Sequence, residues 1–163
     1  MRRHSRQENF SEIRHDIIRQ WCELWSSSPT KDVWFKELVA NIEEWLFQNP
    51  RMETDFYVTQ LLTGHGIFKY YLHKFKLVEI PFCIFCTSEV IDDAQHTIFG
   101  CDRFMRHRLE LSADLEEDLT VKNFQRSALG SLTAWTRIKR FAKEMISVKS
   151  LVFKALDLQW ILD

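Results

Sequence analysis

The stretch from Pro81 to Cys101, PFCIFCTSEVIDDAQHTIFGC, decides the fold, because its cysteines and histidine follow a C-x2-C…H-x4-C pattern. Two cysteines separated by two residues can hold one metal ion from a tight turn whose backbone amides moderate the thiolate charge. His96 and Cys101 lie little more than a helical turn apart, so one short helix can present both. Three sulfurs and one nitrogen favour tetrahedral zinc, and four protein ligands leave no position for a catalytic water. The stretch therefore predicts a structural zinc site made by Cys83, Cys86, His96 and Cys101.

Two other interpretations of this stretch stay open. The cysteines can be buried core residues beside an incidental histidine, or His65, His73 or His107 can replace His96 as the fourth ligand. Loss of the metal would leave three thiolates in a loop with little apolar content, so we expect folding and zinc binding to be coupled here. The fourth cysteine, Cys22, is distant in sequence and is expected in the core.

The composition limits what the 163-residue chain can be. Apolar residues make up 45% of it, whereas it has only 4 glycines and 3 prolines, which favours long helices in one domain or two small lobes. A net charge of −1 does not indicate nucleic-acid binding as a strongly basic chain would. No apolar run approaches the ~20 residues that span a bilayer, and the N-terminus lacks a secretory pattern. We therefore expect an intracellular protein without a membrane partner.

Apolar residues at three- and four-residue spacing predict an all-α, helical bundle-like domain with a zinc knuckle embedded between helices. We expect helices over residues 7–25, 31–48, 53–62, 102–112, 120–129 and 132–149, with Thr120 capping the fifth. The predicted organisation is an N-terminal helical hairpin in residues 1–50, a zinc-knuckle region in 51–118, and C-terminal helices in 119–163 that pack on the same domain.

Three of these helices carry apolar stripes that we expect to face the core. The stripes are Phe10, Ile13, Ile17, Trp21 and Leu24 in the first, Trp34, Leu38, Ile42, Trp45 and Leu46 in the second, and Leu132, Trp135, Ile138, Phe141, Ala142 and Met145 in the last. The tail of residues 151–163 is also apolar, so it either docks on the domain or belongs to an interface.

Three groups of basic residues are candidates for contact with phosphates, although each can equally be solvated helix surface. They are Lys69, Lys74 and Lys76, which we expect to point outward from a short amphipathic segment, Arg103, Arg106 and Arg108 after the last zinc ligand, and Arg137, Arg140 and Lys143 on the polar face of the last helix. The acidic stretch 110–118 lies between the second and third groups. One positive face can therefore form despite the near-neutral total charge.

Two motifs resemble a known family. Residues 59–66, TQLLTGHG, and residues 92–101, DDAQHTIFGC, resemble the C-terminal, CCHC zinc-knuckle region of insect non-long-terminal-repeat (LINE-like) retrotransposon reverse transcriptase polyproteins. The resemblance extends over residues 15–150. In that family the full polyprotein is an endonuclease and an RNA-directed DNA polymerase, and its C-terminal zinc segment is thought to grip template RNA or target DNA.

The resemblance implies that Cys83, Cys86, His96 and Cys101 are the zinc ligands, that RNA or DNA and the rest of a reverse transcriptase are partners, and that the nucleus rather than the cytoplasm is the location. We expect no catalytic residue in this chain, because Asp92-Asp93 lacks the flanking polymerase motifs and His65 is expected to be a turn histidine rather than a general base. The apolar tail departs from the family. A truncated or host-adopted copy that acts as a protein-interaction module is therefore the alternative.

Overall fold

The computed structural model describes residues 2–27, 33–47 and 53–156. Its helices are α1 (Arg2–Ser27), α2 (Val33–Leu38), α3 (Ile42–Phe47), α4 (Phe56–Thr63), α5 (Lys69–Lys74), α6 (Met105–Leu115), α7 (Phe124–Gly130) and α8 (Leu132–Ala155), with a π-helical turn over His96–Gly100 and a 3-10 turn over Asp102–Phe104. The described residues contain no strand, so the all-α prediction is confirmed. None of the described helices combines the length and the apolar character needed to cross a membrane.

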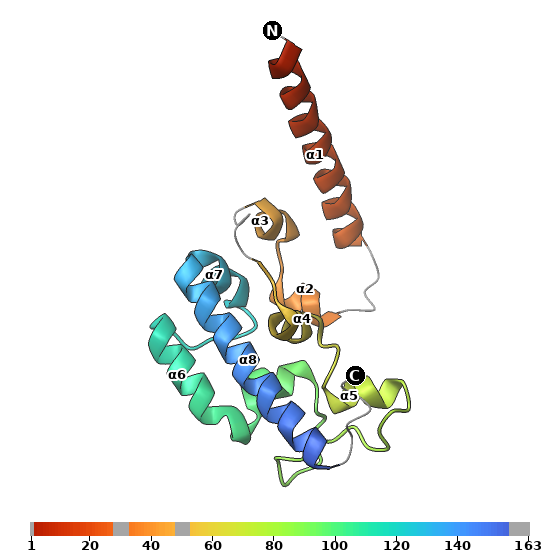
Figure 1. Ribbon diagram of the computed structural model, residues 1–163, viewed down its shortest axis with the longest axis vertical. Helices are drawn as coiled ribbons and strands as arrows, with labels where there is room; N and C mark the ends of the chain where they lie inside the picture. Colours follow the sequence, from red (N-terminus) through yellow and green to blue (C-terminus); the bar gives the residue numbers. More distant parts are fainter. Residues whose placement is uncertain (1, 28–32, 48–52, 157–163) are drawn as a thin grey trace.

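Helix α8 runs through the middle of the folded body (Figure 1) and contributes more buried apolar side chains than any other described helix. Ser131 begins the helix, because its hydroxyl accepts a hydrogen bond from the backbone N–H of Ala134 at 3.0 Å. The helix packs against α4, α6 and α7. Its buried apolar side chains are Trp135, Ile138, Phe141, Ala142, Met145, Ile146 and Phe153. Full burial of such side chains stabilises the fold by roughly 1.5–3 kcal/mol each.

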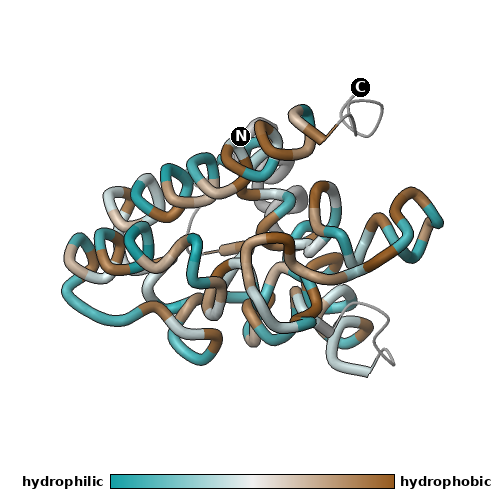
Figure 2. Tube along the Cα trace, turned by 90° about the horizontal axis from the view of Figure 1, so that it is seen from below, coloured by the Kyte–Doolittle hydropathy of each residue, from teal (hydrophilic) through white to brown (hydrophobic). Residues whose placement is uncertain are grey.

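The last helix is longer than predicted. It continues to Ala155 because Phe153 extends the buried face by two turns beyond Met145. The part of the apolar tail up to Leu156 therefore docks through Phe153, and residues 157–163 lie outside the described residues. The prediction for Leu132 was wrong, since this side chain at the first turn is exposed. Figure 2 shows hydrophobic and hydrophilic residues alternating within the turns of the helices, as amphipathic packing requires.

The second predicted helix, over residues 31–48, is two helices in the structure. The chain breaks between Leu38 and Ile42, where the Asn41 side chain accepts a hydrogen bond from the N–H of Glu44 and so caps α3. Gln125 of α7 bonds both the N–H of Asn41, at 2.8 Å, and its carbonyl, at 2.7 Å. This amide satisfies the backbone groups that the break frees. The stripe from Trp34 to Leu46 is nevertheless buried or half-buried.

The first predicted helix is confirmed, but the burial of its stripe is not. Helix α1 projects from the body (Figure 1), and Trp21 and Leu24 are 61% and 65% exposed, with Ile13 and Ile17 also exposed. The side chains of residues before Glu12, including Phe10, lie outside the described side chains. A different face of α1 makes the contacts with the body. It carries Ile18, which is buried, and Trp25 and His15, whose rings meet Phe35 and Phe47.

Helix α4 begins later than the helix predicted over residues 53–62, and hydrogen bonds define both of its ends. The carboxylate of Asp55 accepts hydrogen bonds from the N–H groups of Tyr57 and Val58, and Gly64 ends the helix in the left-handed conformation at φ 68°. The fifth predicted helix begins later than expected, at Phe124. The hydroxyl of Thr120 accepts a hydrogen bond from the N–H of Asn123 at 3.3 Å, and the Asn123 side chain accepts from the N–H and the hydroxyl of Thr120, so Thr120 caps the turn that leads into α7. The division into three regions stays a prediction.

Candidate metal centre

The side chains of Cys83, Cys86, His96 and Cys101 converge on one point in the structure. Their ligand atoms all lie within 4.8 Å of one another. The Sγ atom of Cys101 is 3.8 Å from that of Cys83 and 3.9 Å from that of Cys86, and the Cys86 sulfur is 3.5 Å from Nε2 of His96. In a tetrahedral site with zinc–sulfur bonds of 2.3 Å, neighbouring sulfurs stand ~3.8 Å apart. The four residues therefore fit a metal ion of this size.

The turns around the two inner cysteines present backbone amides to the sulfur atoms. The N–H of Phe85 bonds the Cys83 sulfur, and that of Arg103 bonds the Cys101 sulfur, both from two residues onward. The hydrogen-bonding contact between the two sulfur atoms lowers the pKa of Cys83 to about 5 and raises that of Cys101. A bound cation adds its own charge and draws every coordinating thiol toward the thiolate.

Local pairing shapes the loop that carries these ligands. Phe82 and Ile91 form an isolated antiparallel bridge, with the N–H of Cys83 bonded to the carbonyl of Val90 at 2.8 Å. The carboxylate of Asp93 accepts a hydrogen bond from the N–H of His96 at 2.7 Å. Asp93 thus starts the short turn from which His96 approaches the cysteines, and Cys101 follows directly where that turn ends.

A buried ion pair, which sequence reasoning missed, ties this loop to α8. Nζ of Lys149 lies 2.5 Å from the carboxylate of Asp92, and both side chains are 1% exposed. The same carboxylate accepts bonds from the hydroxyl of Thr97 and the backbone N–H of Lys69. The available signal was the position of Lys149, four residues after Met145 on the apolar face of the helix. A lysine at such a position requires a buried partner.

The competing histidines do not join the cluster. His73 bonds the carbonyl of Val78 through Nδ1 at 3.1 Å, and the ring of His65 stacks on Tyr71. His107 packs its ring against Phe104. Cys22, expected in the core, is half-buried on α1 and is not a member of the cluster.

The arginines after Cys101 differ in their surroundings. The guanidinium of Arg103 lies over the ring of Phe85, 6.0 Å from its centroid. Arg106 forms an exposed ion pair with Glu110 at 2.9 Å. Arg108 is half-buried, and burial lowers its pKa while the negative charge of Cys101 opposes that shift. Of the three, Arg103 and Arg106 are accessible to a ligand in solution.

The basic candidates on α8 have partners within the fold. Arg137 and Arg140 both pair with Asp114 on α6, so the acidic stretch lies against the basic face of α8 and partly neutralises it. Lys143 lies over the ring of Tyr57. Lys74, at the end of α5, and Lys76, two residues later, are both exposed to solvent.

The expectation that Lys69 points outward was wrong. Its side chain is 6% exposed, and burial lowers its pKa although Asp92 opposes the shift. Phe75, an apolar residue directly after α5, is exposed. Helix α5 starts with a backbone bond from Lys69 to the buried Asp92. Because of this hydrogen bond, the first residue of α5 faces the core, whereas Lys74 at its end faces solvent.

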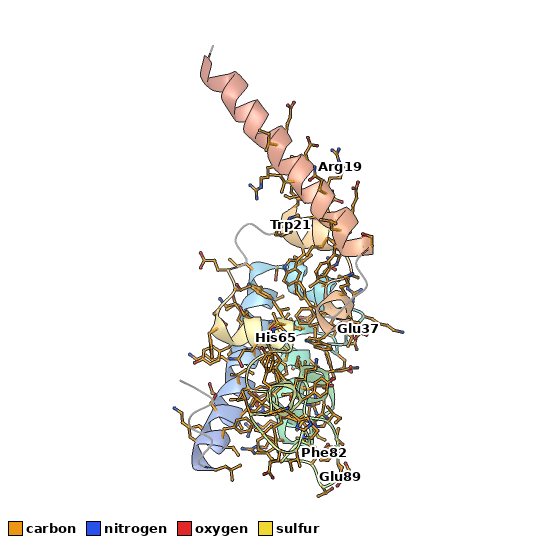
Figure 3. The ribbon with its side chains drawn as sticks, turned by 90° about the vertical axis from the view of Figure 1, so that its right-hand side faces the viewer. Arg19, Trp21, Glu37, His65, Phe82 and Glu89 are labelled. Carbon is orange, nitrogen blue, oxygen red and sulfur yellow. The ribbon has the colours of Figure 1, made fainter. Side chains whose placement is uncertain are left out.

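The arrangement is that of a closed structural site at one end of the molecule. Figure 3 shows Phe82 and Glu89 of the loop at the end opposite to Arg19 and Trp21 on α1. Four protein ligands would fill a tetrahedron, so a metal ion bound here would organise the loop. Asp92 is engaged with Lys149 and Asp93 with the N–H of His96. This aspartate pair therefore has structural partners in the fold.

Comparison with known proteins gives one informative match. The chain is 23% identical over 154 residues to the Retrovirus-related Pol polyprotein from type-1 retrotransposable element R1 4 of Nasonia vitripennis. The alignment covers 91% of this chain and 37% of that polyprotein, so the chain spans little more than a third of its relative's length. No protein-family model and no solved structure matches the chain. The chain is thus similar, along most of its length, to a segment of a retrotransposon Pol polyprotein.

Proposed function

We propose that this chain is a zinc-stabilised accessory segment of an R1-like retrotransposon polyprotein and that it grips template RNA or target DNA during reverse transcription. The observation that carries the proposal is the closed Cys3His cluster within a chain that aligns over 91% of its length with a retrotransposon Pol polyprotein. Zinc is the metal whose size and ligand preference this cluster fits. The cluster would then be a CCHC-type knuckle, and the nucleus the place of action.

The accessible basic side chains nearest to the knuckle are the proposed phosphate contacts. Arg103 lies in the 3-10 turn that directly follows Cys101, and Arg106 lies in the first turn of α6, so metal binding fixes the position of both. Lys74 and Lys76 supply a second exposed pair. Arg137 and Arg140 contribute less, because Asp114 already neutralises them.

Salt dependence of binding tests this proposal. Fluorescence anisotropy with single-stranded RNA and duplex DNA should give roughly micromolar affinity near physiological salt. Each phosphate contact changes the slope of log K against log salt by about −0.7 for single strands and −0.9 for duplexes. Arg103→Ala with Arg106→Ala should therefore flatten the slope by about 1.4 with RNA and about 1.8 with DNA. Arg126→Ala, at an exposed arginine that pairs with Glu117 on a different surface, is the matched control.

A protein-interaction module is the second candidate function. The exposed apolar stripe Ile13, Ile17, Trp21 and Leu24 on the projecting helix favours it. Unchanged RNA and DNA affinity in both the Arg103/Arg106 and the Lys74/Lys76 double variants would favour this candidate over nucleic-acid binding. We further expect that the chain alone neither extends a primer nor nicks DNA.

A further inference from the structure

A cleft beside the metal loop is not explained by zinc binding. It has a volume of about 300 Å³, at the lower end of the roughly 300–1,000 Å³ of small-ligand pockets. Its walls come from α2, from the turn between α4 and α5, from α5, and from the residues that precede His96. Figure 3 shows two of its lining residues, Glu37 and His65, between the projecting helix and the metal loop.

Aromatic rings line much of the cleft. His65 stacks on Tyr71 with ring centroids 4.5 Å apart, and Tyr70 beside them is exposed. The indole N–H of Trp34 donates to the carbonyl of Leu61 at 2.9 Å, which fixes this wall. Flat rings fixed in this way are the surface on which unpaired bases stack.

The turn between α4 and α5 forms the floor and is conformationally restricted. Gly64 takes a positive φ of 68°, and a Cβ atom there would lie 3.2 Å from Cδ1 of Trp34. Gly66 also takes a positive φ, and the side chain of Gln60 fills the space that its Cβ would need. The cleft is therefore preformed by backbone positions that glycine alone suits well.

The acidic and basic side chains that line the cleft are two carboxylates and one lysine. Glu37 and Asp93 contribute carboxylates, and the Asp93 carboxylate also accepts from the N–H of His96. Lys74 lines the cleft and holds its ammonium 4.8 Å from the ring centroid of Tyr70. A base that offers paired N–H donors to a carboxylate suits this set, with its phosphate directed toward the lysine.

We infer that this cleft binds an unpaired guanine of a single-stranded nucleic acid. Guanine offers two adjacent N–H donors, N1–H and N2–H, on its Watson–Crick edge, and one carboxylate can accept both. Glu37 is the proposed acceptor, because its exposed side chain lines the cleft and the Asp93 carboxylate is already bonded to the backbone. The inference rests on the proposed nucleic-acid binding and adds to it a base preference.

Binding of matched oligonucleotides to the zinc-loaded chain tests the inference. The probes are a labelled nine-nucleotide uridine RNA, the same RNA with one central guanosine or inosine, the corresponding DNA strands, and a duplex. A bidentate pair discriminates by about 1–3 kcal/mol, which is roughly 5- to 150-fold. The guanosine RNA should bind at least five-fold more tightly than the uridine RNA. Inosine, which lacks the N2 amino group, should lose most of that preference.

Two variants separate recognition from stacking. Glu37→Gln should abolish the preference for guanosine over uridine and leave binding of the uridine RNA unchanged or slightly tighter. Tyr70→Ala, at an exposed ring, should weaken binding of all single strands by about five-fold or more, since stacking on an aromatic contributes ~1–3 kcal/mol per base. Glu43→Gln on α3 makes the same charge change at an exposed position outside the cleft and is the control.

Equal, salt-dependent affinity for the guanosine, inosine and uridine strands would overturn the inference while leaving the proposed function intact. A guanosine preference that survives in Glu37→Gln would likewise overturn it. Absence of binding to every strand and to the duplex would remove both the inference and the proposed function. The RNA and DNA arms report which of the two strands the cleft accepts.

Discussion

The two longest helices, α1 and α8, both carry apolar stripes at helical spacing, yet they differ in burial. Helix α8 packs against α4, α6 and α7, and its stripe is buried with the exception of Leu132. Helix α1 packs against α3 through one face and leaves Ile13, Ile17, Trp21 and Leu24 exposed. A hydrophobic stripe therefore indicates which face of a helix avoids water, but not whether this chain supplies the surface that covers it.

Substitution of a metal ligand should have the largest effect on stability, and it should distinguish α8 from α1 most clearly. Cys101→Ser removes a buried ligand, and structural zinc in zinc-finger peptides contributes about 10–16 kcal/mol of apparent binding energy. Hydrogen exchange should accelerate throughout residues 81–101 and in the part of α8 near Lys149, whereas α1 should exchange as before. Cys22→Ser, in α1, is the control. Equal loss of protection in both helices would contradict a local role for the metal.

Breaking the buried ion pair should have the next largest effect. Asp92→Asn or Lys149→Met alone leaves one buried charge without its partner, which costs about 3–5 kcal/mol. Urea denaturation should show that the double variant is less destabilised than the sum of the single variants. Asp114→Asn, which breaks the more exposed pair with Arg140, should cost at most about 1 kcal/mol.

A matched pair of isoleucine substitutions compares the stripes themselves. Ile138→Ala opens a cavity in the core and should lower the free energy of unfolding by about 2–5 kcal/mol. Ile17→Ala, at an exposed position of α1, should change it by less than about 0.5 kcal/mol. Thermal or urea unfolding of the isolated chain measures both. A large effect of Ile17→Ala would show that a surface outside the described contacts covers α1.

The smallest expected effect concerns pH. Hydrogen bonds from Ser127 and Asn123 and the charge of Arg126 lower the pKa of Glu117 below its ordinary value of 4.5. A carboxyl with a lowered pKa stabilises the fold above its unfolded-state pKa, and this contribution disappears as pH falls through the lower, folded value. Glu117→Gln should therefore slightly reduce stability near neutral pH and flatten its decline below pH 4.5. The neighbouring Glu116→Gln should leave the acid profile unchanged.

Sequence spacing could predict what depends on neighbours along the chain. The four ligands and the apolar face of α8 are local patterns, and the structure confirms that the ligands converge and that this face is buried apart from Leu132. The break before α3 could not be predicted, because it depends on Gln125, which is 84 residues away from Asn41. For the same reason, the burial of Lys69 was predicted wrongly and the ion pair of Lys149 was not predicted. Both are set by Asp92, a buried partner distant in sequence.

X-ray absorption at the zinc edge of the purified chain tests the central claim most directly, because it reports the identity and distance of the ligands around the metal. The account predicts about one zinc per chain, with three sulfurs at about 2.3 Å and one nitrogen at about 2.0–2.1 Å. His96→Ala should remove the nitrogen contribution. A chain that purifies without zinc, or a site with an oxygen ligand in place of one of these four side chains, would contradict it.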